Sequence, residues 1–348
     1  MNLKSFIAPH LLGLKPYSNA RSEFKGVASV WLDANENPFD KEFDNQINRY
    51  PDPLQTKLKK ELGTIYGVDS ESIFLGNGSD EAIDMVLRLF CVPGQDQVVV
   101  QPPTYSMYEQ TAAIQNVAVL SCPLNPSFQA NLKELKRIIE AEKPKLVFFC
   151  SPNNPTGNDM RLNDIEEILR LKQCIVVVDE AYAEFSEQSA INLLQKYQNL
   201  VVLRTLSKAF GLAGLRVGVA IASPEIIDFL NTIKPPYNIN QLSQLEAHRQ
   251  ISSGRWKGHI ENLINERNKL YKALNESGYF ESVFPSNANF ILVETSRAKE
   301  LYRNLTQLGI VIRDRGAQVK NTLRISVGTQ EENIQLLKAI NTFYNEKG

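Results

Sequence analysis

Five polar loops, each placed directly after an apolar run of the sequence, hold the residue types that could do chemistry. They are residues 76–80, 103–105, 151–157, 179–182 and 205–208. In open α/β sheets, ligands bind beyond the carboxyl ends of the strands. Five such loops in order along the chain therefore predict a single site at one edge of a sheet.

Lys208 is the candidate nucleophile. It ends the apolar stretch LVVLRTLSK, where it would be partly desolvated. Desolvation lowers the pKa of an amine and makes it a better nucleophile. Arg216 follows eight residues later and could reach the same ligand if the intervening glycines bring the chain back. On position alone, the simpler interpretation is a surface lysine at the end of a strand.

Asp179 follows four consecutive apolar residues, IVVV. An acid at the end of a buried strand needs a specific partner, because an unpaired buried charge is costly. A pyridinium nitrogen is one such partner, and Tyr182 could then donate a hydrogen bond to a hydroxyl on the same ring. The alternative is an aspartate that caps the start of a helix.

The stretch GNGSDE at residues 76–81 precedes a helical pattern. Free backbone amides and the positive end of the helix would make it an anion site, most simply for phosphate. A dinucleotide-binding GxGxxG fails at its third position, which is Glu81, and GxxxxGK[ST] is absent. A plain glycine turn with Ser79 or Asp80 as the cap remains the alternative.

The composition is that of a globular protein of about two domains. The chain has 348 residues, of which 43% are hydrophobic and 22% charged, and its net charge is −1. This balance gives no general attraction to nucleic acid or to an anionic membrane. No apolar run approaches the roughly 18 residues needed to span a bilayer, and the first residues make a poor signal peptide. With four scattered cysteines and no metal-ligand spacing among the three histidines, we expect a cytoplasmic protein without a metal.

Short apolar runs alternate with amphipathic helical patterns from about residue 60 to residue 235. This alternation predicts an α/β fold with a mostly parallel sheet between helices. Beyond it, a helical stretch over 241–277, with a break near 253–254, leads to shorter strands expected at ANFILVET, GIVIRD and NTLRISVG, with helices between them and at the end. We therefore expect an N-terminal arm at 1–30 associated with the small domain, a large ligand-binding domain at 31–240, and a small α+β domain at 241–348.

The motifs SPNNPTG, DEAY and TLSKAFGLAGLRVG, in that order, resemble those of the fold-type I pyridoxal-phosphate aminotransferases of the aspartate aminotransferase superfamily. Asn154, Asp179, Lys208 and Arg216 follow one another after 25, 29 and 8 residues. The resemblance extends from LDANENP to LRISVG, nearly the whole chain. Within the superfamily, LKPY, NRYPDP, PPTYSMY, PPYNIN and GIVIRDRG look most like the histidinol-phosphate aminotransferases.

The resemblance implies pyridoxal 5′-phosphate as cofactor and assigns roles to residues. Lys208 would bond the cofactor and then move a proton, and Asp179 would pair with the pyridinium nitrogen. The other residues implied to hold the cofactor are Asn154, Tyr182, Tyr105, Gly78, Ser79, Asp80, Ser207, Arg216 and, from the partner subunit of a homodimer, Tyr50. Those implied to bind substrate are Tyr17, Asn154, Arg313 and Arg324, because guanidinium groups suit both carboxylate and phosphate.

The implied reaction is a ping-pong transamination between L-histidinol phosphate and 2-oxoglutarate that forms imidazole-acetol phosphate and L-glutamate. An aromatic amino-acid aminotransferase or a threonine-phosphate decarboxylase on the same scaffold remains the alternative. A non-enzymatic cofactor-binding regulator is a third possibility, but such proteins usually carry a DNA-binding segment, and none is apparent in the sequence.

Overall fold

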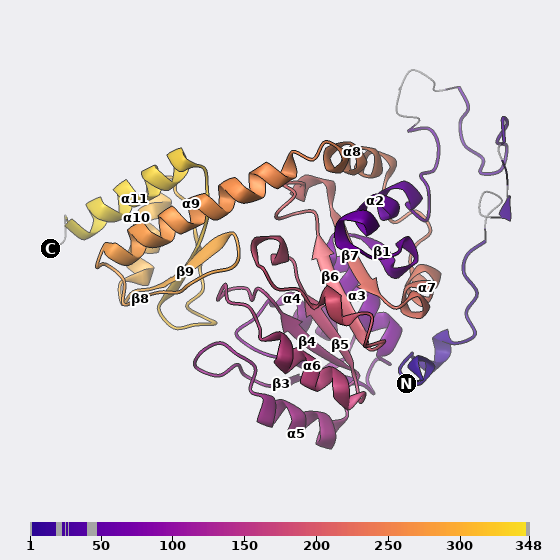
Figure 1. Ribbon diagram of the computed structural model, residues 1–348, viewed down its shortest axis with the longest axis horizontal. Coiled ribbons are helices and arrows are strands. Elements are labelled where there is room, and N and C mark those ends of the chain that lie inside the picture. The colour runs from indigo at the N-terminus through magenta and orange to yellow at the C-terminus, as the bar shows by residue number, and fades with distance from the viewer. Residues whose placement is uncertain (1, 19–22, 25, 27, 40–46, 346–348) are drawn as a thin grey trace.

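The structure is a computed structural model, and it describes residues 2–18, 23–24, 26, 28–39 and 47–345. Its larger part is built on seven strands: β1 (Ile73–Asn77), β2 (Gln97–Val100), β3 (Ala118–Ser121), β4 (Leu146–Cys150), β5 (Ile175–Asp179), β6 (Leu200–Thr205) and β7 (Val217–Ala222). They form one sheet in the order β1-β7-β6-β5-β4-β2-β3 (Figure 1). Strand β7 is antiparallel to both its neighbours, and the other neighbouring pairs are parallel. The predicted fold class, a mostly parallel α/β sheet, is confirmed.

Helices cover both faces of this sheet. One face carries α2 (Thr56–Tyr66), α5 (Leu132–Glu142) and α6 (Leu162–Leu171), and the other carries α3 (Ser79–Phe90), α4 (Met107–Ile114) and α7 (Pro224–Ile233). Successive residues of a strand point to opposite faces. In β5, Val176 and Val178 accordingly belong to the first core and Ile175 and Val177 to the second. Because both faces are covered, the central strands are continuous apolar runs.

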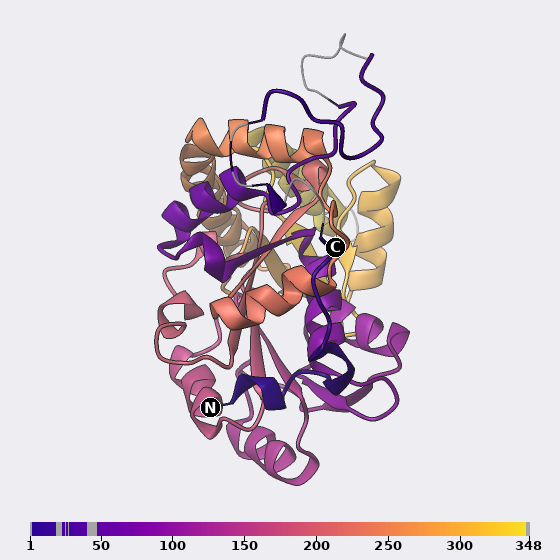
Figure 2. The same ribbon diagram turned by 90° about the vertical axis from the view of Figure 1, so that its right-hand side faces the viewer.

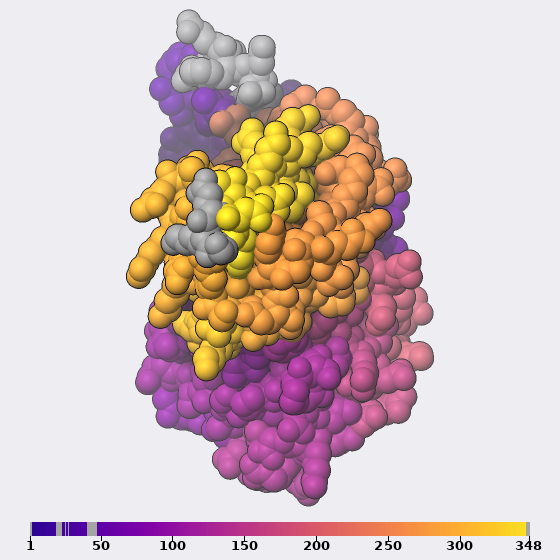
Figure 3. All heavy atoms as spheres, turned by 90° about the vertical axis from the view of Figure 1, so that its left-hand side faces the viewer, coloured from indigo at the N-terminus to yellow at the C-terminus, as the bar shows by residue number. Residues whose placement is uncertain are grey.

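The C-terminal part has its own sheet and core. Helix α8 (Gln241–Ser252) comes first and still packs in the core on the α2 face of the large sheet, through Ala247 and Ile251. The elements that follow are α9 (Trp256–Glu276), β8 (Ser282–Val283), β9 (Phe290–Glu294), α10 (Ala298–Gln307), β10 (Arg313–Asp314), β11 (Thr322–Ser326) and α11 (Gln330–Asn345). The strands form an antiparallel sheet in the order β10-β11-β9-β8, and α9, α10 and α11 pack on it through a separate apolar cluster. In Figure 3 the orange and yellow C-terminal residues form a body stacked on the magenta part of the chain.

The N-terminal turns pack on the large sheet, whereas the sequence predicted an arm associated with the small domain. Leu3 and Ile7 are buried in the core on the α3 face of the large sheet, and the Ala8 amide donates to the Leu89 carbonyl at 2.8 Å. Figure 2 shows the N-terminus well away from the yellow C-terminal helices. The reason is apolar burial, since Leu3 and Ile7 are one helical turn apart and complete that core together. Of the arm, residues 1, 19–22, 25 and 27 lie outside the described residues.

Two further expectations concern the C-terminal half. The predicted break near 253–254 is confirmed, because α8 ends at Ser252 and α9 begins at Trp256. The strand expected over GIVIRD is reduced to the two residues Arg313 and Asp314, which pair with β11.

Candidate active site

A cavity of about 240 Å³ lies at the carboxyl ends of β4, β5 and β6. The predicted site residues that line it are Lys208, Asp179, Tyr182, Asn154, Tyr105, Ser79, Asp80, Ser207, Arg216 and Arg324. The rest of its lining is Cys150, Ala181, Thr205 and Arg315. Parallel strands end at a common edge, so loops far apart in the sequence meet here, as expected.

Asp179 is a buried carboxylate that forms no ion pair among the described residues. It is the last residue of β5 and is 3% exposed. Its Oδ2 accepts a hydrogen bond from the Tyr108 hydroxyl at 2.6 Å, and its Oδ1 accepts one from the Ala181 amide at 3.0 Å. Burial raises the pKa of Asp179 above its ordinary value, while these two hydrogen bonds oppose the rise. Asp179 therefore caps the turn after β5 and still offers a carboxylate suited to a protonated ring nitrogen.

Lys208 supplies the amine of the site. Its Nζ lies over the Tyr182 ring, 5.5 Å from the ring centroid. Burial, and then the nearby charge of Arg324, lower the pKa of Lys208 below its ordinary value. A larger neutral fraction makes the amine a better nucleophile, as the sequence analysis expected.

The start of α3 forms an anion cradle with the loop that precedes β7. Gly78 is the N-cap of α3 with φ +81°, and its amide donates to the Arg216 carbonyl at 2.8 Å. A Cβ on Gly78 would collide with the Arg216 guanidinium, and a Cβ on Gly218 would collide with the Gly78–Ser79 backbone. Both glycines are therefore needed for this close approach. Helix amides and a guanidinium then face the cavity together, which suits phosphate.

Asn153 and Asn154 have different tasks. Asn153 is fully buried, and its side chain donates to the Pro103 carbonyl at 2.9 Å and accepts from Thr104 Oγ1 at 3.0 Å, which fastens two site loops together. Asn154 lines the cavity, where its Oδ1 accepts a hydrogen bond from Arg324 Nη1. Arg324 belongs to β11, so this bond links the small sheet to the large one.

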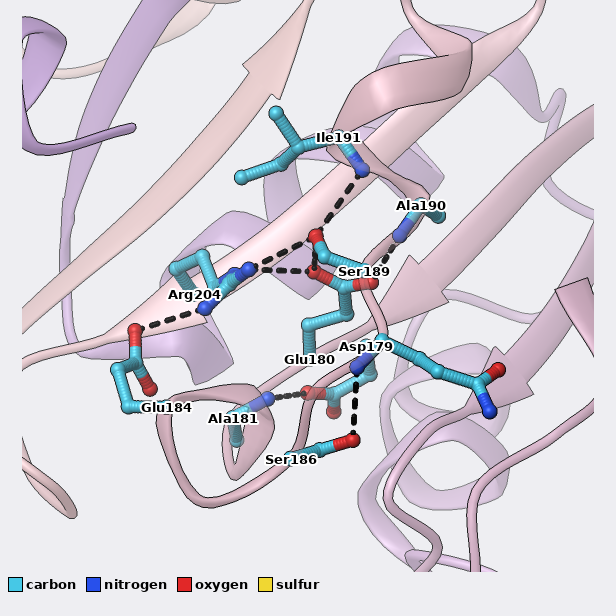
Figure 4. Close-up of polar contacts among 10 residues, drawn as sticks. Asp179, Glu180, Ala181, Glu184, Ser186, Ser189, Ala190, Ile191 and Arg204 are labelled. Atoms are coloured by element: carbon cyan, nitrogen blue, oxygen red, sulfur yellow. Dashed lines mark hydrogen bonds and ion pairs between the residues drawn. The ribbon is translucent and has the colours of Figure 1, made fainter. Parts of the chain in front are cut away.

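A buried ion-pair cluster ties together the two strands that lead to Asp179 and Lys208 (Figure 4). Arg204 on β6 places Nη2 at 2.8 Å from Glu180 Oε2 and Nη1 at 2.8 Å from Glu184 Oε1. All three side chains are less than one-tenth exposed. Glu180 directly follows Asp179 and points away from the cavity, because neighbouring residues of an extended chain alternate. The cluster therefore fixes the segment after Asp179 relative to β6, which leads to Lys208, from the side that faces away from the cavity.

The remaining predicted residues do not line the cavity. Gly78 lies directly before Ser79, which does. Arg313 is exposed on β10, opposite Arg324 in the antiparallel register. Tyr50 is half exposed and stacks on Tyr237 with ring centroids 4.5 Å apart, and Tyr17 is 66% exposed.

Tyr108, Arg315 and Cys150 were not predicted from the sequence, and Thr205 was predicted only as part of the loop at 205–208. Tyr108 follows Tyr105 by one helical turn, and Arg315 follows Arg313 by the two-residue period of a strand. Cys150 and Thr205 are the last residues of β4 and β6, which was a usable signal. Burial raises the pKa of the Cys150 thiol to about 12, so it behaves as a packing residue rather than as a nucleophile.

Comparison with known proteins places these residues in a family. Residues 16–340 match the family described as aminotransferase class I and II. The chain is 47% identical to the histidinol-phosphate aminotransferase of Parabacteroides distasonis over 97% of this chain and 98% of that protein. The chain belongs to the class I and II aminotransferases. The fold of this aminotransferase is similar to that of the histidinol-phosphate aminotransferase of Clostridium acetobutylicum, with TM-score 0.79 and 24% identity over 86% of this chain and 92% of that chain.

The family depends on pyridoxal 5′-phosphate. The fold of this chain is also similar to that of the histidinol-phosphate aminotransferase of Sinorhizobium meliloti, which was solved in complex with pyridoxal 5′-phosphate. The TM-score between the two is 0.75, with 24% identity over 85% of this chain and 84% of that chain. The cavity fits this group. The Asp179 carboxylate, which forms no ion pair among the described residues, suits its ring nitrogen, the cradle at Gly78 suits its phosphate, and the Lys208 amine suits its aldehyde. When bound, the cofactor supplies an electron sink for the carbon that exchanges the amino group. In the described part of the chain, no helix is long and apolar enough to cross a membrane.

Proposed function

We propose that this aminotransferase exchanges an amino group between L-histidinol phosphate and 2-oxoglutarate, giving imidazole-acetol phosphate and L-glutamate in histidine biosynthesis. The observation that carries the proposal is one cavity that joins Lys208 and Asp179 to the guanidinium of Arg324. The Parabacteroides distasonis relative, which is 47% identical over nearly the full length of both chains, is named for this activity, and this supports the choice of substrate.

Each residue then has a task that its surroundings support. Asp179 would keep the ring nitrogen protonated, and Asn154 and Tyr182 would hold the ring hydroxyl. Tyr105 would lie against the ring, and the Gly78–Asp80 turn with Ser207 and Arg216 would hold the phosphate. Lys208 would bond the cofactor and would carry the proton to and from the substrate carbon.

The substrates share an anionic end, and the arginines of the small sheet fit it. Arg324 forms no ion pair among the described residues, and its buried Nε has no hydrogen-bond partner there. We assign it, with Arg313 and the arm residue Tyr17, to binding the phosphate of one substrate and the carboxylate of the other.

The experiment is a single half-reaction without a keto acid. The purified protein, loaded with pyridoxal phosphate, receives L-histidinol phosphate, L-phenylalanine or O-phosphothreonine, while the visible spectrum of the cofactor and the release of carbon dioxide are followed. We expect rapid spectral change with L-histidinol phosphate and a far slower one with the others.

A faster change with phenylalanine would replace the proposal by an aromatic aminotransferase, and carbon dioxide from O-phosphothreonine would replace it by a decarboxylase. The matched control is Lys208→Ala, which should fold, lose the visible band of the lysine-bound cofactor, and lose turnover. Turnover retained in that variant would overturn the role of Lys208.

We further propose a homodimer in which Tyr50 reaches the cofactor phosphate of the partner subunit. Tyr50 lines a surface cavity of about 600 Å³ together with Tyr237 and the exposed Leu242, and it does not line the active-site cavity of its own chain. We also propose that the protein is located in the cytoplasm, which cell fractionation would test. The division into domains at residues 31–240 and 241–348 likewise remains our proposal.

A further inference from the structure

Three arginines share one face of the small sheet, beside the active-site cavity. Arg313 and Arg324 are directly opposite each other in the antiparallel register of β10 and β11. Arg315 follows Arg313 by two residues, and its amide donates to the Thr322 carbonyl at 3.0 Å, so the extended pairing continues to it. Side chains two residues apart on an extended chain point the same way. Of the three, Arg315 and Arg324 line the cavity with Lys208.

No carboxylate balances this cluster. Among the described residues, none of the ion pairs includes Arg313, Arg315 or Arg324. The Nε atoms of Arg315 and Arg324 are buried and lack a hydrogen-bond partner there. Like charges placed opposite each other in a sheet are destabilising. Burial and the charges of Arg324 and Arg313 lower the pKa of Arg315 to about 10. Such an arrangement is unfavourable in the empty protein and becomes favourable when an anion binds.

The loop that carries Arg315 is firmly held. The Arg315 carbonyl accepts hydrogen bonds from the amides of Gln318 and Val319, at 2.8 and 2.9 Å. Gln318 Nε2 donates to the Thr104 carbonyl at 2.9 Å, which connects the loop to the residue before Tyr105. Arg315 is therefore fixed relative to the large sheet as well as to its own strand. A fixed guanidinium loses little freedom when it binds a ligand.

We propose that Arg315 is a specificity-determining residue that, together with Arg324, recognises the phosphate of the amino donor. The proposal rests on the proposed function, which supplies a phosphorylated substrate. A carboxylate carries one negative charge and is satisfied by one guanidinium, whereas a phosphate monoester carries close to two at neutral pH. Of the guanidiniums that line the cavity, Arg324 thus serves both substrates and suffices for the carboxylate of glutamate, and Arg315 adds the charge that only the phosphate requires.

The test compares the holoenzyme with Arg315→Gln in separate half-reactions with L-histidinol phosphate, L-histidinol and L-glutamate. A lost charge-assisted hydrogen bond to phosphate should lower kcat/KM for L-histidinol phosphate by about 10- to 100-fold. For L-histidinol and L-glutamate we expect changes within about threefold. Arg315→Lys should recover part of the loss, because it restores the charge without the fork. An equal loss with all three substrates, or none with L-histidinol phosphate, would overturn the proposal.

Two controls separate the possible failures. Lys320→Gln removes the same charge from an exposed position of the same loop, outside the cavity lining, and should leave all three half-reactions unchanged. Arg315→Gln should unfold at the same temperature as the wild type or higher, because the Arg315 side chain forms no hydrogen bond with the described residues and repulsion is relieved. If the wild type itself converts L-histidinol as well as L-histidinol phosphate, the proposed function fails and Arg315 loses this role with it. If the wild type prefers L-histidinol phosphate and Arg315→Gln keeps that preference undiminished, the Arg315 proposal alone fails.

Discussion

The environment of Asp179 depends in part on Tyr108, a residue that was given no role from the sequence. The Tyr108 hydroxyl donates a 2.6 Å hydrogen bond to Asp179, and the Tyr108 ring stacks on Phe148 with centroids 4.8 Å apart. A donor to the carboxylate favours its charged form. Burial works in the opposite direction, so Tyr108 is one of the groups that keep Asp179 ionised in a dry site.

Tyr108→Phe should therefore impair catalysis while leaving the packing intact. The substitution keeps the ring that stacks on Phe148 and removes the donor, so the pKa of Asp179 rises further. The hydrogen bond is to a charged group, and we expect kcat to fall by about 10- to 100-fold at neutral pH. The acid limb of the kcat profile should move to higher pH, because Asp179 must be ionised to pair with the ring nitrogen. An unmoved acid limb would contradict this role for Tyr108.

Residue types and spacing were sufficient to predict most of the cavity lining, including Lys208 and Asp179. They were not sufficient for Tyr108 or Arg315. Whether a tyrosine one turn after Tyr105 faces the site depends on the rotation of α4 against the sheet, and tertiary packing sets that rotation. Likewise, which of Arg313 and Arg315 reaches the cavity depends on where β10 ends.

At the scale of elements, strands β5 and β6 are joined by more than backbone hydrogen bonds. Arg204 links β6 to the segment after β5 through Glu180 and Glu184, and its guanidinium lies 5.4 Å from the centroid of the Tyr66 ring on α2. Removal of the cation would leave two buried carboxylates without its opposite charge, although Glu180 still accepts hydrogen bonds from Ser189 and the Ala190 amide. Buried clusters of this kind contribute little in total, but their disruption is costly.

Arg204→Met should lower the free energy of unfolding by about 3 to 5 kcal/mol. The measurement is urea unfolding at pH 7. The control is Arg170→Met, which removes an ion pair of α6 with Glu166 and a hydrogen bond to Tyr197 at the surface, and which should leave the free energy of unfolding nearly unchanged. Equal losses in the two variants would show that Arg204 has no special structural role.

Helix α2 carries a buried lysine rather than a buried ion-pair cluster. Lys59 on α2 is 6% exposed, and burial, reinforced by the charge of Lys234, lowers its pKa to about 8. In the unfolded chain its pKa is about 10.4. Between these values the unfolded state binds more protons, so this group makes stability rise with pH over that window. Below pH 8 the folded state carries the full cost of the buried ammonium.

Lys59→Met should therefore stabilise the protein by about 2 to 3 kcal/mol at pH 7. The gain should shrink above pH 8 and disappear near pH 10.5, as measured by urea unfolding across this range. Lys57→Met, at an exposed position on the same helix, should give neither a gain nor a pH dependence. A stabilisation that persists unchanged at pH 10.5 would have to come from apolar packing rather than from the removed charge.

The order of helices and strands was predictable, because apolar runs and amphipathic periods are local signals. The position of β7 was not, since its antiparallel pairing with β1 and β6 depends on contacts between segments far apart in the chain. The packing of Leu3 and Ile7 on the large sheet was missed for the same reason. The apolar residues of a short turn predict that the turn is buried, but they do not predict against which surface it packs.

At the scale of the whole molecule, exposed apolar side chains are concentrated in the N-terminal segment and at the start of α8. Leu32 and Phe39 are 90% and 89% exposed, and Tyr50 and Leu242 about half exposed. A gathering of this kind on one part of a soluble protein marks an interaction surface. A second copy of the chain is the partner that the proposed dimer supplies, since a two-fold axis presents the same patch on both subunits.

Subunit complementation tests whether the active sites are shared. Tyr50→Ala and Lys208→Ala should each be nearly inactive as homodimers. In a mixed dimer, the subunit that keeps Lys208 receives an intact Tyr50 from its partner, so one of the two sites is complete. Random reassociation of equal amounts should thus recover about a quarter of the wild-type activity. The measurement is the half-reaction with L-histidinol phosphate, after native mass spectrometry has established that mixed dimers formed. Mixed dimers without activity would place Tyr50 outside the partner's site, and a fully active Tyr50→Ala homodimer would remove it from catalysis altogether.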